Sequence, residues 1–221
     1  MRLLLIRHAE SQGNFEHRLQ GRRDYPLTER GLTQARALAE RLAPIPLAVI
    51  YASPIGRAFQ TAERIADAAS LTVIPEPRLQ EYDFGDAVSG LTWPEIATAH
   101  PEIVAGLRNG GSDFPHYPGE EGREAFHQRV SLALSAITMR HNDADAVVVV
   151  THAGPISVYL LQVLGRDYKR PIPFSLDNAS ITTIEFGHQP ATGTPQVTVT
   201  GVNDTCHLKQ IMSSDRASGT A

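Results

Sequence analysis

Two short apolar runs, each ending near a histidine, constrain the fold of this 221-residue chain more than any other feature. Residues 3–6 read Leu-Leu-Leu-Ile and run directly into Arg7 and His8, and residues 147–150 are four valines that lead, after one threonine, to His152. An unbroken apolar run of this length is typical of a strand that is buried on both faces of a parallel sheet. We therefore expect an α/β fold.

Apolar strands and amphipathic helices alternate along the rest of the chain. Further strands are expected at residues 47–51, 71–74, 179–186 and 196–202, which gives a mostly parallel sheet of about six strands. Helices are expected at residues 28–42, 55–69, 92–104, 124–139 and 156–164. Thr28 suits the N-cap of the first helix, and Ser53 with Pro54 suits the N-cap and first turn of the second. Trp93 and Ile96 are expected to be buried anchors.

Four nitrogen-rich side chains stand at the expected strand ends. Arg7 and His8 follow one strand, His152 follows another, and Arg57 lies in the first turn of the helix after a third. These ends share one edge of a parallel sheet, so the four side chains can converge. Arginine suits phosphate, and a neutral imidazole can attack a phosphoryl group. Each residue alone could be structural, but the joint pattern indicates an anion site.

Other polar residues are candidates for the same site. Glu81 and Asp83 are both possible acids, and alternation along a strand would place them on one face. Either carboxylate could equally be solvated. Asn14, Gln20 and the Gly21 backbone N–H are neutral donors close in sequence to the first histidine. Asn14 could equally be a turn residue.

Composition and spacing narrow the range of functions. The net charge of −4 and the lack of a basic, aromatic patch argue against nucleic-acid binding. Arg22 and Arg23 are expected in a solvated turn, and the histidines away from strand ends mostly at the surface. The single cysteine, Cys206, allows no internal disulfide, and no His or Cys pair has metal-ligand spacing. With no membrane-spanning run either, we expect a cytoplasmic protein without a metal or cofactor.

Taken in order, these motifs resemble those of the histidine phosphatase superfamily, the phosphoglycerate-mutase-like clan. The opening match is Leu5-Ile6-Arg7-His8-Ala9-Glu10-Ser11 with Asn14. The other matching stretches are residues 24–31, 53–58 with 60–62, 79–81 with 84–85, and 150–154, and weaker ones are residues 178–181, Asn203 and 207–208. The resemblance covers about residues 2–208, and the ordered set is specific although each piece alone is not.

The resemblance implies a three-layer α/β/α fold and a set of site residues. It makes His8 the nucleophile that becomes phosphohistidine, and Glu81 the acid that protonates the leaving group and then takes a proton from the acceptor. The phosphoryl group or substrate would be held by Arg7, Asn14, Gln20, Gly21, Arg57 and His152. Arginines would then supply the charge that a metal supplies in other phosphoryl-transfer enzymes.

We therefore expect one domain over residues 1–208, with residues 80–145 forming the substrate rim and residues 209–221 a disordered tail. Residues 86–90 depart from the family, which often has Trp-Glu-Gly there. The expected function is hydrolysis of small phosphomonoesters. The alternatives are a cofactor-dependent phosphoglycerate mutase and a weakly active regulator that binds a phosphorylated ligand or a protein. The acidic, glycine-rich loop at residues 106–122 favours hydrolysis over mutase chemistry. The sequence also leaves open whether the protein forms a homodimer.

Overall fold

The computed structural model describes residues 1–108, 116–142, 145–166, 173–189 and 192–209. In this part of the chain six strands form one sheet in the order β3-β2-β4-β1-β5-β6. The strands are β1 (Arg2–Arg7), β2 (Leu47–Ala52), β3 (Val73–Pro75), β4 (Ala146–Thr151), β5 (Ile181–His188) and β6 (Pro195–Asp204). The first four strands of that order are parallel, and β5 and β6 are antiparallel to their neighbours. The expected mostly parallel sheet is confirmed.

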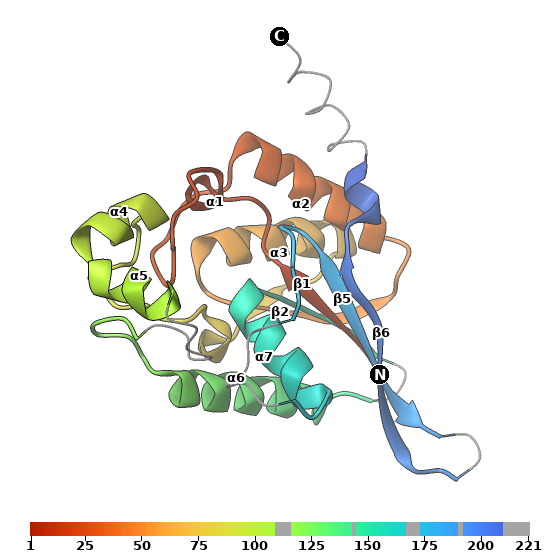
Figure 1. Ribbon diagram of the computed structural model, residues 1–221. Coiled ribbons are helices and arrows are strands. Elements are labelled where there is room, and N and C mark those ends of the chain that lie inside the picture. The colour runs from red at the N-terminus through yellow and green to blue at the C-terminus, as the bar shows by residue number, and fades with distance from the viewer. Residues whose placement is uncertain (109–115, 143–144, 167–172, 190–191, 210–221) are drawn as a thin grey trace.

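Helices cover both faces of this sheet. They are α1 (Gln12–Phe15), α2 (Glu29–Leu42), α3 (Gly56–Ala69), α4 (Trp93–Ala99), α5 (Pro101–Arg108), α6 (Arg123–Thr138) and α7 (Ala153–Val163), with 3-10 turns η1 (Pro77–Leu79) and η2 (Cys206–Leu208). Figure 1 shows α2 and α3 on one face, α6 and α7 on the other, and α4 with α5 beyond one end of the sheet. The three-layer α/β/α arrangement is confirmed.

The central strands explain why their sequences are apolar without alternation. In β1, Leu3 and Leu5 belong to the core under α6 and α7, whereas Leu4 and Ile6 belong to the core under α2 and α3. All six residues of β4 are buried in the same way. Burying a large aliphatic side chain contributes about 1.5–3 kcal/mol. Both faces of β1 and β4 therefore stabilise the sheet and fix the position of the residues at its carboxyl edge.

The start of α3 differs from the expectation. The helix begins at Gly56, its N-cap is Ile55, and no side chain caps it. Ser53 is fully buried, and its hydroxyl lies 2.9 Å from the Nε2 atom of His152. The prediction that Ser53 caps the helix is wrong because the chain makes an extra turn before the helix starts. Arg57 still lies in the first helical turn.

The expected helix at residues 92–104 is two helices, α4 and α5, that meet at His100. The residue before a proline avoids the helical region, and His100 accordingly has φ −136° and ψ 63° ahead of Pro101. Ile96 is buried as predicted, but Trp93 is 46% exposed, so that prediction is wrong. The small apolar cluster that α4 joins is filled by Ile96 and its neighbours. The indole therefore stays at the margin of the cluster.

The rim and the tail are only partly described. The start of the expected loop at residues 106–122 is helical, because α5 extends to Arg108. Residues 109–115 of that loop and residues 210–221 of the tail lie outside the described residues. Among the described helices, none is long and apolar enough to cross a membrane.

Candidate active site

The carboxyl ends of β1, β2 and β4 bring together four of the predicted site residues: Arg7, His8, Arg57 and His152. The Nε atom of Arg57 lies 3.2 Å from Nε2 of His8. The rings of His8 and His152 meet edge to face, with centroids 5.1 Å apart. The convergence expected from the parallel sheet is therefore present in the structure.

His8 is held as a neutral imidazole with a defined tautomer. Its Nδ1 atom lies 2.7 Å from the carbonyl oxygen of Ala9, and that oxygen can only accept, so Nδ1 carries the proton. The Nε2 atom then carries a lone pair, which accepts a hydrogen bond from Nε of Arg57. Burial, followed by the charges of Arg57 and Arg7, lowers the pKa of His8 well below its ordinary value of 6.5. The ring is thus a free base at neutral pH, as a nitrogen nucleophile must be.

Arg57 is almost completely buried, and backbone carbonyls fix its orientation. Its Nη1 and Nη2 atoms donate to the carbonyls of Arg23 at 2.7 Å and Gly21 at 2.8 Å. Gly21 adopts the left-handed φ of +54° that favours glycine in this turn. Burial lowers the pKa of Arg57 to about 10, so the guanidinium is still charged at pH 7. A cation is thereby fixed beside the unprotonated nitrogen of His8, to which it donates a hydrogen bond.

Arg7 and His152 each present a buried nitrogen without a partner among the described residues. Arg7 donates from Nη1 to the carbonyl of Leu176, but its Nε has no acceptor. His152 bonds Ser53 through Nε2, and its Nδ1 has no partner. Burial is the largest cause that lowers the pKa of both groups. Since an unpaired buried donor costs about 1–3 kcal/mol, the arrangement favours an added acceptor such as a phosphoryl oxygen.

Glu81 enters the site from an irregular segment that follows η1. Its Oε2 accepts the N–H of Gly154 at 3.2 Å, in the first turn of α7, and its Oε1 accepts the N–H of Tyr82 at 2.8 Å. A Cβ atom on residue 154 would overlap Oε1 of Glu81, so a larger residue there would displace the carboxylate from this position. Residues 80–85 form no strand, and Asp83 instead pairs with Arg22 at 3.5 Å. The prediction that the two acids share a strand face is wrong.

The predicted neutral donors lie on one side of His8. The Oδ1 atom of Asn14 accepts from the Nδ2 of Asn178 at 3.2 Å, and the same amide donates to the carbonyl of His8 at 3.1 Å. Gln20 is buried, and its Oε1 accepts the hydroxyl of Ser11, which also donates to Asn14. This network supports the loop after β1. A role for Asn14, Gln20 or the Gly21 N–H in holding substrate stays a prediction.

Sequence reasoning missed several residues that support the site. It assigned Ser53 to a helix cap, gave no role to Asn178 in holding His8, and passed over Arg129, which contacts the segment that carries Glu81. The position of Ser53 at the end of a strand was a usable signal. Nothing in the local sequence marks Arg129, because it lies in the middle of an ordinary amphipathic helix.

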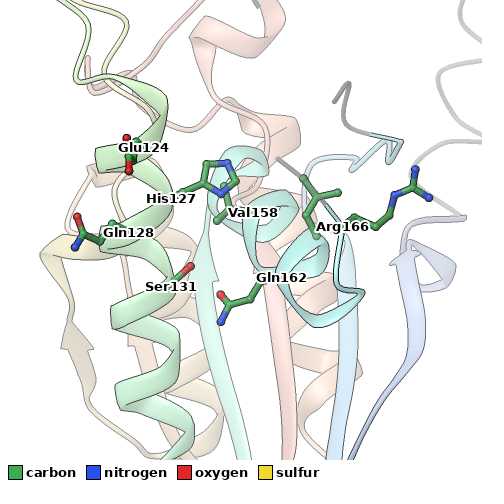
Figure 2. A pocket seen from close by; sticks show the side chains of 8 residues that line it. Glu124, His127, Gln128, Ser131, Val158, Gln162 and Arg166 are labelled. Carbon is green, nitrogen blue, oxygen red and sulfur yellow. The ribbon is translucent and has the colours of Figure 1, made fainter. Parts of the chain in front are cut away.

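Two further features were considered as sites. Among the described residues no group of three or more His, Cys, Asp or Glu side chains is placed to hold a metal ion. A groove of about 500 Å³ lies between α6 and α7, and Figure 2 shows the polar and apolar side chains that line it. Its lining residues are Glu124, His127, Gln128, Ser131, Val158, Leu161, Gln162 and Arg166. None of them is a predicted site residue, so the groove is separate from the strand-end site.

Known proteins share this sequence and fold along nearly the whole chain. Phosphoserine phosphatase 1 of Hydrogenobacter thermophilus is 36% identical over 211 residues, which cover 94% of each chain. A probable phosphoglycerate mutase GpmB of Enterobacter sp. is 33% identical over 194 residues, 86% of this chain and 87% of the relative. The vanadate (VO3) complex of mycobacterial glucosyl-3-phosphoglycerate phosphatase is 27% identical, with a TM-score of 0.79, and the match covers 92% of this chain and 99% of that one. Residues 3–194 match the family model for branch 1 of the histidine phosphatases, and the chain belongs to the histidine phosphatase superfamily.

Proposed function

We propose that this protein hydrolyses phosphomonoesters of small metabolites through a phosphohistidine formed on His8. One observation carries the proposal: the unprotonated Nε2 of a neutral, buried His8 accepts a hydrogen bond from the Arg57 guanidinium at 3.2 Å, beside Arg7 and His152. A nucleophile surrounded by fixed donors is the arrangement that phosphoryl transfer requires, because charge on the three equatorial oxygens must be stabilised.

The first step transfers the phosphoryl group to the enzyme. Arg7, Arg57 and His152 bind its non-bridging oxygens, and Nε2 of His8 attacks phosphorus. The bond from phosphorus to the ester oxygen breaks as the phosphorus–nitrogen bond forms. Glu81 gives a proton to the departing oxygen, so that an alcohol leaves.

The second step returns the enzyme to its starting state. The Glu81 carboxylate takes a proton from a water molecule, which attacks the phosphohistidine. The phosphorus–nitrogen bond breaks, its electron pair returns to Nε2 of His8, and inorganic phosphate is released. The guanidinium groups supply positive charge in both steps, so we expect the reaction to need no metal.

Relatives support the class of substrate. The two similar phosphatases are named for phosphoserine and for glucosyl-3-phosphoglycerate, both of which are small phosphorylated metabolites. The shared fold and the strand-end site make a phosphomonoester of this size the best-supported substrate. The individual metabolite would be identified by a screen of phosphorylated metabolites that measures phosphate release.

The test replaces His8 by alanine. The wild-type protein should release phosphate from p-nitrophenyl phosphate in the presence of EDTA, and rapid quenching with labelled substrate should trap an acid-labile, base-stable phosphoprotein. His8→Ala should lose several orders of magnitude in kcat and show no trapped label, as expected when a covalent nucleophile is removed. His100→Ala, a histidine outside the site, should behave as wild type. Full activity in His8→Ala, or a loss in EDTA that one metal restores, would refute the proposal.

A further inference from the structure

Arg129 in α6 holds the segment that carries Glu81. Its Nη1 atom donates to the carbonyls of Arg78 at 2.8 Å and Gln80 at 2.7 Å, and its Nη2 donates to the carbonyl of Glu81 at 2.9 Å. Residues 80–85 form no strand, so this stretch has no sheet ladder to fix it. The single guanidinium supplies hydrogen bonds that a neighbouring strand would otherwise supply.

Glu121 in turn fixes Arg129. The Nε and Nη2 atoms of Arg129 donate to the two carboxylate oxygens of Glu121, at 2.9 and 2.7 Å. The side chains are only 18% and 13% exposed, so water screens this bidentate pair little. Glu121 also accepts the backbone N–H of Asp83 at 3.1 Å. The Arg129–Glu121 ion pair thus binds the backbone before Glu81, at Gln80, and after it, at Asp83.

The same helix also shapes the wall behind the acid. The Arg129 guanidinium lies over the ring of Phe126, 4.8 Å from its centroid. Phe126 packs close to Gly154, the residue whose N–H binds the Glu81 carboxylate. The main chain of Glu81 is therefore held by α6, and its carboxylate is held at the start of α7.

We infer that Arg129, held by Glu121, is a positioning residue for the proton transfer by Glu81. The inference rests on the proposed function, in which Glu81 is the general acid. A proton donor must lie within hydrogen-bond reach of the leaving oxygen, and a displacement of 1 Å can cost about 100-fold in rate. Lysine has no planar fork and cannot serve three carbonyls and a bidentate carboxylate at once. Arg129→Lys should therefore keep the charge and lose the positioning.

The experiment compares two leaving groups. An alkyl phosphomonoester needs a proton on its departing oxygen, whereas p-nitrophenolate scarcely does. Arg129→Lys should lower kcat for the alkyl ester by about 10- to 100-fold with little change in KM, and should barely affect p-nitrophenyl phosphate. Arg64→Lys, on the exposed side of α3, is the matched control and should change neither rate. Equal losses on both substrates would mean a general structural role and overturn the inference.

A double variant separates this inference from the proposed function. If Arg129 acts through Glu81, adding Arg129→Lys to Glu81→Gln should cost nothing further on the alkyl ester. Additive losses would overturn the inference. A selective loss in Glu81→Gln with none in Arg129→Lys would overturn the positioning role alone. Equal losses on both substrates in Glu81→Gln would overturn the acid assignment and the inference with it.

Glu121→Gln provides a second route to the same answer. It keeps the shape of the side chain and removes the charge that orients Arg129, so it should give the same selective loss on the alkyl ester. If Arg129→Lys does not fold, Glu121→Gln decides the question. An unchanged leaving-group dependence in a folded Glu121→Gln would overturn the inference.

Discussion

His152 needs Ser53 to present the correct nitrogen to a phosphoryl group. The ring is buried and its pKa is lowered well below 6.5, so at neutral pH it carries one proton, on either Nδ1 or Nε2. The Ser53 hydroxyl lies 2.9 Å from Nε2, and when it donates there the proton stays on Nδ1, the atom without a partner. We expect Ser53→Ala to lower kcat/KM by about tenfold, the equivalent of one hydrogen bond worth about 1.4 kcal/mol.

The measurement for this residue is steady-state phosphate release together with thermal unfolding. Ser157→Ala, another buried serine but one in the middle of α7, is the control and should keep its activity. Ser53→Ala with wild-type kcat/KM would show that the tautomer of His152 is set by something else.

Whether a site residue can be predicted from the sequence depends on which structural feature fixes its position. His8, Arg57 and His152 could be predicted because the backbone of a parallel sheet carries strand ends to one edge, whatever packs elsewhere. The position of Ser53 at a strand end was available in the sequence in the same way. The partners of Arg129 were not, because they form only when α6 packs against the irregular segment at residues 78–81. A residue whose role is to hold another side chain leaves little trace in its own stretch of sequence.

At the scale of elements, the start of α2 is packed directly against the catalytic loop. A Cβ atom on Gly31 would overlap the backbone carbonyl of Glu10, two residues beyond His8. The backbone cannot rotate away as a flexible side chain can. We expect Gly31→Ala to destabilise the protein by about 1–3 kcal/mol and to lower kcat by displacing the loop after β1. Urea unfolding and phosphate release measure the two effects.

Gly187 in β5 is the matched control for this substitution. A Cβ atom there meets nothing within 4 Å, so Gly187→Ala should leave both stability and activity close to wild type. Equal behaviour of the two variants would show that the helix start and the catalytic loop are not coupled.

Element boundaries failed at two places, one for a local and one for a tertiary reason. The sheet and its long helices follow from periodicity, but the expected helix at residues 92–104 breaks at His100 because Pro101 follows it. The segment around Glu81 alternates like a strand, yet its carbonyls bind Arg129 instead of a neighbouring strand. In both places the hydrogen-bonding capacity of one residue, Pro101 or Arg129, outweighs the average structural preference of the surrounding sequence.

At the scale of the whole molecule, buried neutral histidines make stability depend on pH. The pKa values of His8, His152 and His207 are all lowered from 6.5, with burial as the largest cause. Below pH 6.5 these histidines are protonated in the unfolded chain but stay neutral in the folded chain. Their contribution to the free energy of unfolding is therefore complete above pH 6.5 and is lost as the pH falls below it. The two fully buried histidines, His8 and His152, should each cost about 1.4 kcal/mol of stability per pH unit in that range, and the half-buried His207 should cost less.

Urea unfolding at pH 8, 7, 6 and 5 measures this dependence. His207 is a useful reporter because it is half-buried, its pKa is lowered by burial, and it lies outside the strand-end site. His207→Leu should flatten the profile without touching the site. Stability that holds steady or rises between pH 7 and pH 5 would contradict the prediction.

The charges around the rim also bear on what would attack the proposed phosphohistidine. A mutase must hold a second anionic group and retain a bisphosphate long enough for it to reorient. Arg22 and Arg23, which follow Gly21 in the chain, are the cations that could hold such a group. In the structure Arg22 is partly buried rather than solvated, and it pairs with Glu121 at 2.5 Å and Asp83 at 3.5 Å. Its charge is therefore offset, and the side chain of the exposed Arg23 donates a long hydrogen bond, at 3.4 Å, to the carbonyl of Asp86.

We therefore expect hydrolysis to dominate over mutase chemistry. The protein would be given 3-phosphoglycerate with a trace of 2,3-bisphosphoglycerate, and the rates of formation of 2-phosphoglycerate and of inorganic phosphate would be compared. Because the paired acids offset the cation at the rim, a second phosphate gains little there and water is the acceptor that remains. Phosphate should appear faster than 2-phosphoglycerate, and His8→Ala should form neither. If 2-phosphoglycerate forms much faster than phosphate, the mutase assignment replaces the phosphatase assignment, because the same phosphohistidine would then be passing its phosphoryl group to a sugar acid instead of water.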